Sequence, residues 1–171
     1  MKESDTYVPN QEALWKQTEA EDRSLYNLAY YLRSKGQHTI YTNTEVKYFP
    51  LGEDMFRDMC DALKKAEKYI YVEYFIIQSG TFWNTLVDIM AQKVTEGVDV
   101  RVMYDDLGSI GTFSVTDIFE LSQKGIKCIP FNPFLFIKSQ LNNRDHRKLM
   151  VIDGKVAYSG GVNLADEYIN E

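Results

Sequence analysis

The sequence predicts an α/β fold with a mixed, mainly parallel sheet that is flanked by helices on both faces. Residues 69–77 form an almost continuous apolar run, which is typical of a strand buried on both faces. Residues 98–104 alternate between apolar and polar side chains, as in a second strand. Apolar residues at helical spacing lie between these strands and again before a third strand at 126–131. Alternating strands and helices imply right-handed crossovers and parallel pairing.

The first part of the chain is predicted to be a helical lead-in over residues 1–36. Residues 10–21 are polar with few apolar anchors, and leucines at helical spacing then continue until Gly36 ends the second helix. Residues 39–49 are rich in β-branched and aromatic side chains around Asn43, which indicates a short hairpin or an extended pair. The main domain is expected over residues 37–171.

The other elements of the main domain follow in regular order. A helix with one apolar face begins near Gly52 and precedes the strand at 69–77. Further helices are expected at 82–94 and 117–124, each followed by a glycine. The last strands, 148–152 and 155–159, are joined by an Asp-Gly dipeptide, which between two such runs indicates a β-hairpin.

Composition argues against several classes of protein. A chain of 171 residues that is 44% hydrophobic and 26% charged is ordinary for a soluble globular domain. No apolar run reaches the ~20 residues that span a bilayer, and no signal peptide opens the chain, so we expect this piece to be soluble. The formal net charge of -6 argues against nucleic acid as a partner. Cys60 and Cys128 lack metal-ligand spacing, and no metal site is predicted.

The most informative motif is His146-Arg147-Lys148, followed by Asp153 and by Gly160-Gly161-Val162-Asn163. Side chains alternate along a strand, so His146 and Lys148 are expected to point to the same side. A neutral imidazole can attack phosphorus, while lysine and asparagine can hold the non-bridging oxygens. Gly161 and the glycine before it allow backbone N–H groups to approach a phosphate. Because the rest of this constellation follows a given histidine by chance on the order of once in a million, the motif indicates phosphodiester chemistry.

This motif resembles the signature of the phospholipase D superfamily, His-x-Lys-x4-Asp-x6-Gly-(Gly/Ser)-x-Asn, and matches it at every fixed position. The wider sequence is similar to the bacterial cardiolipin synthase branch of that superfamily. The segments that carry this similarity lie between about Leu25 and the end of the chain: 43–46, 49–52, 72–77, 101–109 and 142–148.

The resemblance implies a two-step transfer that needs neither a metal nor a cofactor. His146 would attack phosphatidylglycerol and release glycerol, and a second phosphatidylglycerol would then attack the phosphohistidine to give cardiolipin. Lys148 and Asn163 would stabilise the phosphoryl oxygens, with Gly161 on the phosphate-binding side. The family also counts Asp153 as catalytic, whereas its position at a hairpin turn indicates that it holds the turn.

The family's active site combines two such signatures, and this chain has one. In the family, one histidine is the nucleophile and the other protonates the leaving alcohol. His38 cannot be the second copy, because no lysine stands two residues after it. We therefore expect residues 37–171 to be the first of two phospholipase D-like domains, truncated at its C-terminal end and inactive alone.

The expected partners follow from this half-site. They are an anionic phospholipid, phosphatidylglycerol, and a second phospholipase D-like domain from the same parent chain or from a second copy. The parent protein is expected at the bacterial cell membrane, with its catalytic part on the cytoplasmic side or peripheral. The alternative is a single-signature phosphodiesterase or nuclease that forms its site across a homodimer. The acidic balance argues against a nuclease, and the intact signature argues against a non-catalytic lipid-binding module.

Three further sequence features each have two possible roles, one in function and one in the fold. Glu73 interrupts an apolar strand, so it either orients a catalytic histidine or pairs with a basic residue. Asp105-Asp106 follows a strand, where it either lines a ligand cleft or caps a turn, and the cap is the favoured interpretation. The apolar loop side chains 134–137 either contact the bilayer interface or pack under the domain. Basic residues at 138, 144 and 147 would suit anionic headgroups at such an interface.

Overall fold

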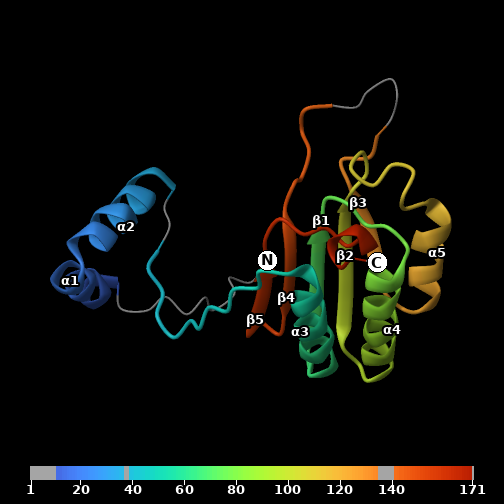
Figure 1. The fold of residues 1–171 in the computed structure, drawn as a ribbon, viewed down its shortest axis with the longest axis horizontal. Helices are drawn as coiled ribbons and strands as arrows, with labels where there is room; N and C mark the ends of the chain where they lie inside the picture. The colour runs from blue at the N-terminus through green and yellow to red at the C-terminus, as the bar shows by residue number, and fades with distance from the viewer. Residues whose placement is uncertain (1–10, 37–38, 135–140, 171) are drawn as a thin grey trace. The chain divides into compact units, whose positions relative to one another are not determined.

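The computed structural model describes residues 11–36, 39–134 and 141–170 (Figure 1). The chain divides into two units, Met1–Tyr48 and Phe49–Glu171. Across the described ranges, no helix is both long and apolar enough to cross a bilayer.

The first unit contains two helices, α1 (Gln11–Glu21) and α2 (Arg23–Gly36). Asp22 separates them, and its carboxylate accepts the backbone N–H groups of Ser24 and Leu25, which caps the start of α2. Trp15 of α1 packs edge-on against Tyr26 of α2, with ring centroids 5.6 Å apart. The lead-in is therefore a pair of helices held together by aromatic packing.

The hairpin predicted at 39–49 is wrong, because residues 39–48 contain no strand. Asn43 does have the left-handed backbone of a turn, with φ 61°. The side chains that suggested strands lie in solvent, with Val46 86% and Tyr48 84% exposed. β-branched and aromatic composition favours a strand only where a partner strand and a packing face exist.

The second unit is built on a five-stranded sheet with strand order β3-β2-β1-β4-β5. The first three strands are parallel, and the last two form an antiparallel hairpin beside β1. The α/β class and the mixed sheet are thus confirmed, with two parallel and two antiparallel strand pairs in the described part of the chain. In chain order the elements are α3 (Gly52–Lys64), β1 (Tyr69–Tyr74), α4 (Thr81–Thr95), β2 (Asp99–Asp105), α5 (Val115–Gln123), β3 (Lys127–Phe131), β4 (Lys148–Ile152), β5 (Val156–Ser159) and the 3-10 helix η1 (Asp166–Tyr168).

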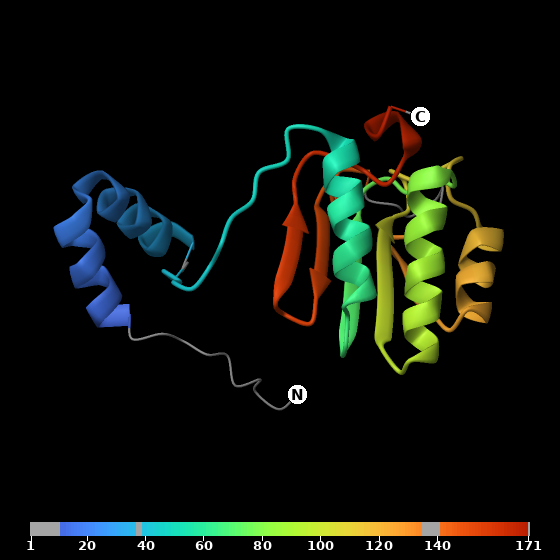
Figure 2. The same ribbon diagram turned by 60° about the horizontal axis from the view of Figure 1, so that its bottom comes forward.

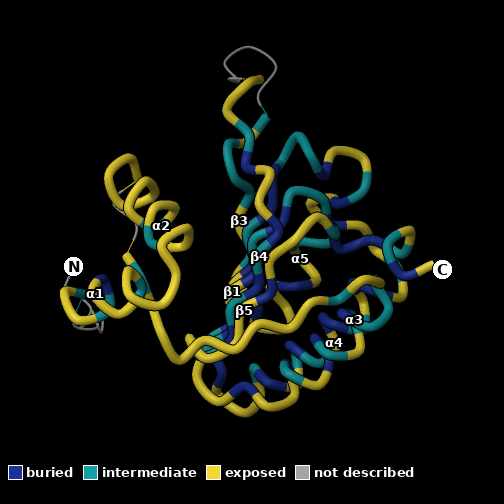
Figure 3. The backbone as a smooth tube through the Cα atoms, turned by 60° about the vertical axis from the view of Figure 1, so that its left-hand side comes forward, coloured by how far each residue is buried: buried dark blue, intermediate teal, exposed yellow. Residues whose placement is uncertain are grey.

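The helices of this unit cover one face of the sheet, not both as the sequence predicts. The chain steps from β1 to β2 to β3 in one direction, so right-handed crossovers place α4 and α5 on the same face. Helix α3 packs beside α4, and Figure 2 shows the two side by side in front of the strands. Figure 3 shows the buried positions gathered between these helices and the sheet.

The opposite face of the sheet is open among the described residues. Ile70, Val72 and Tyr74 are buried against the helices, whereas Tyr71 between them is 39% exposed. The run at 69–77 is therefore not a strand buried on both faces. The open face forms an apolar groove of about 470 Å³, whose lining includes Tyr71, Met103, Ile129, Leu149 and Val151.

The carboxyl ends of the parallel strands meet at one edge of the sheet. The start of β4 reaches the same edge, because Lys148 pairs with Tyr74 at the end of β1. Ligands of α/β folds commonly bind at this edge, where loops from several strands gather. The sheet topology thus brings the histidine motif next to the loops that follow β1 and β2.

Candidate functional site

His146 and Lys148 lie together at the start of β4. The His146 side chain is exposed, whereas Lys148 is only 5% exposed. The Lys148 ammonium donates to the backbone carbonyl of His146 at 2.9 Å and lies 4.9 Å from the centroid of the Phe75 ring. The His146 imidazole lies 4.5 Å from the same ring. The pair therefore combines an accessible imidazole with a fixed, buried cation.

The environment of Lys148 affects its protonation. Burial lowers the pKa of the ammonium, and the charge of Asp145 acts in the opposite direction. A buried ammonium acts strongly on a nearby anion, because little water screens its field.

Asn163 lies at the same edge of the sheet. Its side-chain oxygen accepts the backbone N–H of Ile76 at 3.2 Å, and its nitrogen donates to the hydroxyl of Tyr168 at 2.8 Å. The side-chain nitrogen carries two hydrogens, and the bond to Tyr168 uses one of them, so the other can donate to a ligand. The structure therefore holds Asn163 firmly beside the segment that follows β1, two residues from the end of that strand.

Gly160 and Gly161 follow β5 and are exposed. A Cβ at either position would meet no atom within 4 Å, so the packing of this chain does not require glycine there. A backbone without side chains in open space leaves its N–H groups accessible to a bound phosphate.

Asp153 lies at the opposite end of β4 from His146. Strands rise by about 3.4 Å per residue, so the length of β4 separates Asp153 from the other signature residues. Its carboxylate accepts the backbone N–H groups of Glu67, Lys68 and Tyr69 at 2.8–2.9 Å. Burial raises the pKa of Asp153, but these three donors outweigh it and the pKa is lowered. Asp153 joins the hairpin turn to the start of β1.

Glu73 pairs with a basic residue. Its carboxylate lies 2.6 Å from the guanidinium of Arg147, which also binds Asp145 through two nitrogens at 2.9 and 3.1 Å. Among the described residues, no hydrogen bond or ion pair joins Glu73 to His146. Asp145 and Arg147, which flank His146, are thus bonded to each other, and Arg147 also forms an ion pair with Glu73 of β1 on the open face of the sheet.

Asp105 caps the turn that follows β2, whereas Asp106 binds a distant segment. Asp105 is buried and accepts the backbone N–H groups of Gly108 at 2.9 Å and of Asp145 at 2.8 Å. Arg144 donates to the same carboxylate at 3.3 Å, so it is held inside the fold. Asp106 accepts the backbone N–H of Phe134 at 2.6 Å. The rest of the apolar loop, 135–137, lies outside the described residues, as do Lys138 and His38.

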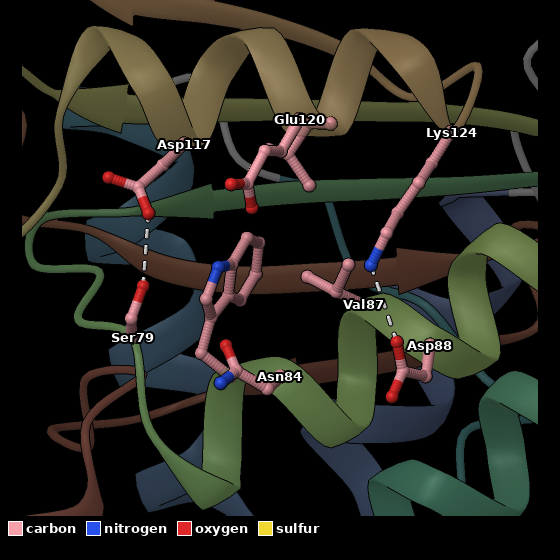
Figure 4. Close-up of a pocket in the computed structure, with 9 residues that line it drawn as sticks. Ser79, Asn84, Val87, Asp88, Asp117, Glu120 and Lys124 are labelled. Atoms are coloured by element: carbon pink, nitrogen blue, oxygen red, sulfur yellow. Dashed lines mark hydrogen bonds and ion pairs between the residues drawn. The ribbon is translucent and has the colours of Figure 1, made fainter.

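A separate cavity of about 330 Å³ lies between α4 and α5 (Figure 4). It is lined by no signature residue. Asp117 there accepts from Ser79, and Lys124 pairs with Asp88. In the described ranges, no group of three His, Cys, Asp or Glu residues is arranged to hold a metal ion.

Sequence reasoning did not identify Phe75, Tyr168 or the contact between Asp105 and the Asp145 backbone. Phe75 lies inside the apolar run that predicted a strand, where nothing distinguished it from its neighbours. The available signal was Gly108-Ser109 in the loop after β2, because a glycine there permits close approach of another segment.

The chain is similar in sequence to known proteins over most of its length. Residues 59–171 match the model of the family described as cardiolipin synthase, phospholipase D-like domain. The chain is 39% identical over 133 residues to a probable cardiolipin synthase of Bacillus subtilis, covering 77% of this chain and 26% of that protein. It is 40% identical over 141 residues to a cardiolipin synthase of Oceanobacillus iheyensis, covering 81% and 29%. The chain thus spans less than a third of the length of these two relatives.

Solved structures share the fold. The phospholipase D family member Nuc of Salmonella typhimurium aligns with a TM-score of 0.53 at 16% identity, covering 67% of this chain and 68% of that one. Phosphatidylserine synthase of Haemophilus influenzae aligns with a TM-score of 0.52 at 19% identity, covering 71% and 29%. At these identities the likeness concerns the fold, and the family rests on the sequence match. The chain belongs to the cardiolipin synthase family of phospholipase D-like domains.

Proposed function

We propose that this chain carries one half of the active site of a phosphatidyltransferase that condenses two phosphatidylglycerol molecules to cardiolipin and glycerol. The observation that carries the proposal is the exposed His146 imidazole beside the buried Lys148 ammonium, in a chain related to cardiolipin synthases. The relatives' printed activity supports a phospholipid rather than a general phosphodiester as the substrate.

The reaction proceeds through a phosphohistidine. An imidazole nitrogen of His146 forms a bond to phosphorus while the bond from phosphorus to the glycerol oxygen breaks. A hydroxyl of the second phosphatidylglycerol then forms a new phosphorus–oxygen bond, and the phosphorus–nitrogen bond breaks. Lys148, Asn163 and the backbone at Gly161 stabilise the phosphoryl oxygens in both steps. Asp153 serves the fold and not the chemistry, because its carboxylate is bound to the start of β1.

The other half of the site supplies the proton transfers. An acid must protonate the departing glycerol oxygen, and its conjugate base must accept the proton of the incoming hydroxyl. A second phospholipase D-like domain of the same parent chain provides this group, or a second copy of this chain does. We expect the isolated chain to be inactive and the complete enzyme to work at the bacterial membrane, where its substrate resides.

The test compares His146→Ala with His38→Ala in the whole parent protein. Cardiolipin formation is measured from vesicles of radiolabelled phosphatidylglycerol, and the protein is checked for acid-labile label. We expect His146→Ala to abolish both product and labelled protein, and His38→Ala to leave both unchanged. Wild-type product yield in His146→Ala contradicts the proposal.

A second assay separates the proposal from a homodimeric phosphodiesterase or nuclease. The isolated chain is examined by light scattering and by turnover of a generic phosphodiester and of DNA. We expect no turnover. A dimer that cleaves either substrate and loses this activity in His146→Ala would support the homodimer instead.

A further inference from the structure

The side chain of Phe75 lies against both groups of the proposed site. Its ring centroid is 4.5 Å from that of His146, with the planes inclined by 55°. The Lys148 ammonium lies 4.9 Å from the same centroid, within the range of a cation–π interaction. One aromatic ring therefore contacts the nucleophile and the cation at once.

The loop after β2 fixes the position of this ring. A Cβ at Gly108 would lie 2.5 Å from the Phe75 carbonyl oxygen and 2.6 Å from a ring carbon, so only glycine permits this approach. Ser109 is fully buried, and its hydroxyl donates to the Phe75 carbonyl and accepts the Ile77 N–H, both at 3.1 Å. The loop thus holds the backbone on both sides of Phe75.

The same loop holds the segment that carries the nucleophile. Asp105 accepts the backbone N–H of Asp145, the residue before His146, at 2.8 Å. Asp105 also accepts the Gly108 N–H, so the carboxylate links the turn that supports Phe75 to the segment that precedes His146. The relative position of the ring and the imidazole therefore depends on one buried loop.

We propose that Phe75 is a positioning residue for this site, and that its ring, held by Gly108 and Ser109, orients the His146 imidazole and retains the Lys148 ammonium beside it. The inference rests on the proposed function for its catalytic consequence. The ring faces an exposed imidazole that has no hydrogen bond from a side chain among the described residues, so ring packing restricts its orientation. Correct orientation matters because a displacement of about 1 Å can lower a rate by about a hundredfold.

The first experiment examines the placement of Phe75 without any activity. The chain has two histidines, so imidazole proton signals are assigned by comparison with His38→Ala. In the wild-type chain we expect nuclear Overhauser contacts between the Phe75 ring and the His146 imidazole. Phe75→Leu is expected to change the chemical shifts of the His146 imidazole protons and to leave those of His38 unchanged. Absence of the Overhauser contacts overturns the inference, even if Phe75→Leu fails to fold.

The second experiment measures kcat and KM in the whole parent protein. Phe75→Leu is expected to lower kcat by about tenfold to a hundredfold with little change in KM, since the ring positions the reacting groups and does not bind the lipid. Phe75→Tyr, which keeps the ring, is expected to retain kcat near the wild-type value. Tyr71→Leu is the matched control, because it removes an aromatic ring on the open face of β1, the strand that precedes Phe75.

The outcomes are distinct. An equal loss of kcat in Tyr71→Leu and Phe75→Leu, or wild-type kcat in Phe75→Leu, overturns the positioning role. Full activity of His146→Ala would contradict the proposed function, whereas the Overhauser contacts test the placement of Phe75 independently.

Discussion

At the scale of single residues, Glu73 is the group whose protonation the fold changes most clearly near the site. Burial raises its pKa to about 7, and the hydrogen bond and charge of Asp145 act in the same direction, while Arg147 lowers it. The pKa of Asp145 falls to about 2: burial raises it, but Arg147 and Glu73 outweigh this effect. The two carboxyl groups therefore share one proton over a wide pH range.

This arrangement predicts a pH-dependent stability. Glu73 has a higher pKa in the folded chain than its ordinary value of 4.5, so the folded state binds the proton more tightly. Its contribution is fully present below about pH 4.5 and is lost as the pH rises to about 7. Each unit of pKa shift corresponds to about 1.4 kcal/mol, and solvent screening reduces the expected loss to about 1–2 kcal/mol.

Glu73→Gln should remove this loss, because a neutral amide does not titrate. Urea unfolding at pH 5 and at pH 7 measures the free energy of unfolding of wild type and variant. The exposed Glu120→Gln is the control and should keep the wild-type difference between the two pH values. The same difference in Glu73→Gln as in wild type would contradict this assignment.

At the scale of elements, the β4–β5 hairpin is predicted correctly and the hairpin at 39–49 is not. The Asp153-Gly154 turn has φ 55° and 66°, which Asp and Gly tolerate, and both flanking strands have partners. Residues 39–48 have similar composition but no partner strand. Composition thus identifies strand-compatible segments, whereas pairing depends on what lies beside them.

Asp153→Ala is expected to destabilise the second unit by about 1–3 kcal/mol, because three backbone N–H groups just before and at the start of β1 lose a charged acceptor. Urea unfolding measures the change. Asp61→Ala removes a carboxylate in an exposed ion pair and should cost less than about 0.5 kcal/mol. The chemical shifts of the His146 imidazole protons should not change in Asp153→Ala. A changed shift would place Asp153 in the site.

At the scale of the whole molecule, the hydrophobic core belongs to the second unit. The core cluster extends from Met55 to Ile169 and includes none of the described residues of the first unit. We therefore predict that residues 49–171 fold without residues 1–48, with nearly the free energy of unfolding of the whole chain. Thermal unfolding of the shortened chain, followed by circular dichroism, measures this. A shortened chain without a cooperative transition would show that the two units stabilise each other.

The open face of the sheet also belongs to this scale. Right-handed crossovers in a single direction place α4 and α5 on one face, so the other face has no helix among the described residues. The sequence led to the opposite expectation, because the almost continuous apolar run at 69–77 indicated a strand buried on both faces. Whether a strand is covered on one face or on two depends on the order in which strands are added to the sheet.

The sequence by itself determined the family and the fold class. His146, Lys148 and Asn163 stand at signature spacing, and the alternation of strands and helices follows from local hydrophobic periodicity. The tertiary structure decided which other residues contact this signature. Phe75 reaches His146 only because Tyr74 pairs with Lys148, and the carboxylate of Asp105 reaches Asp145 across forty residues of chain. Contacts of this kind depend on strand register and loop packing between distant segments, which residue spacing along one segment does not specify.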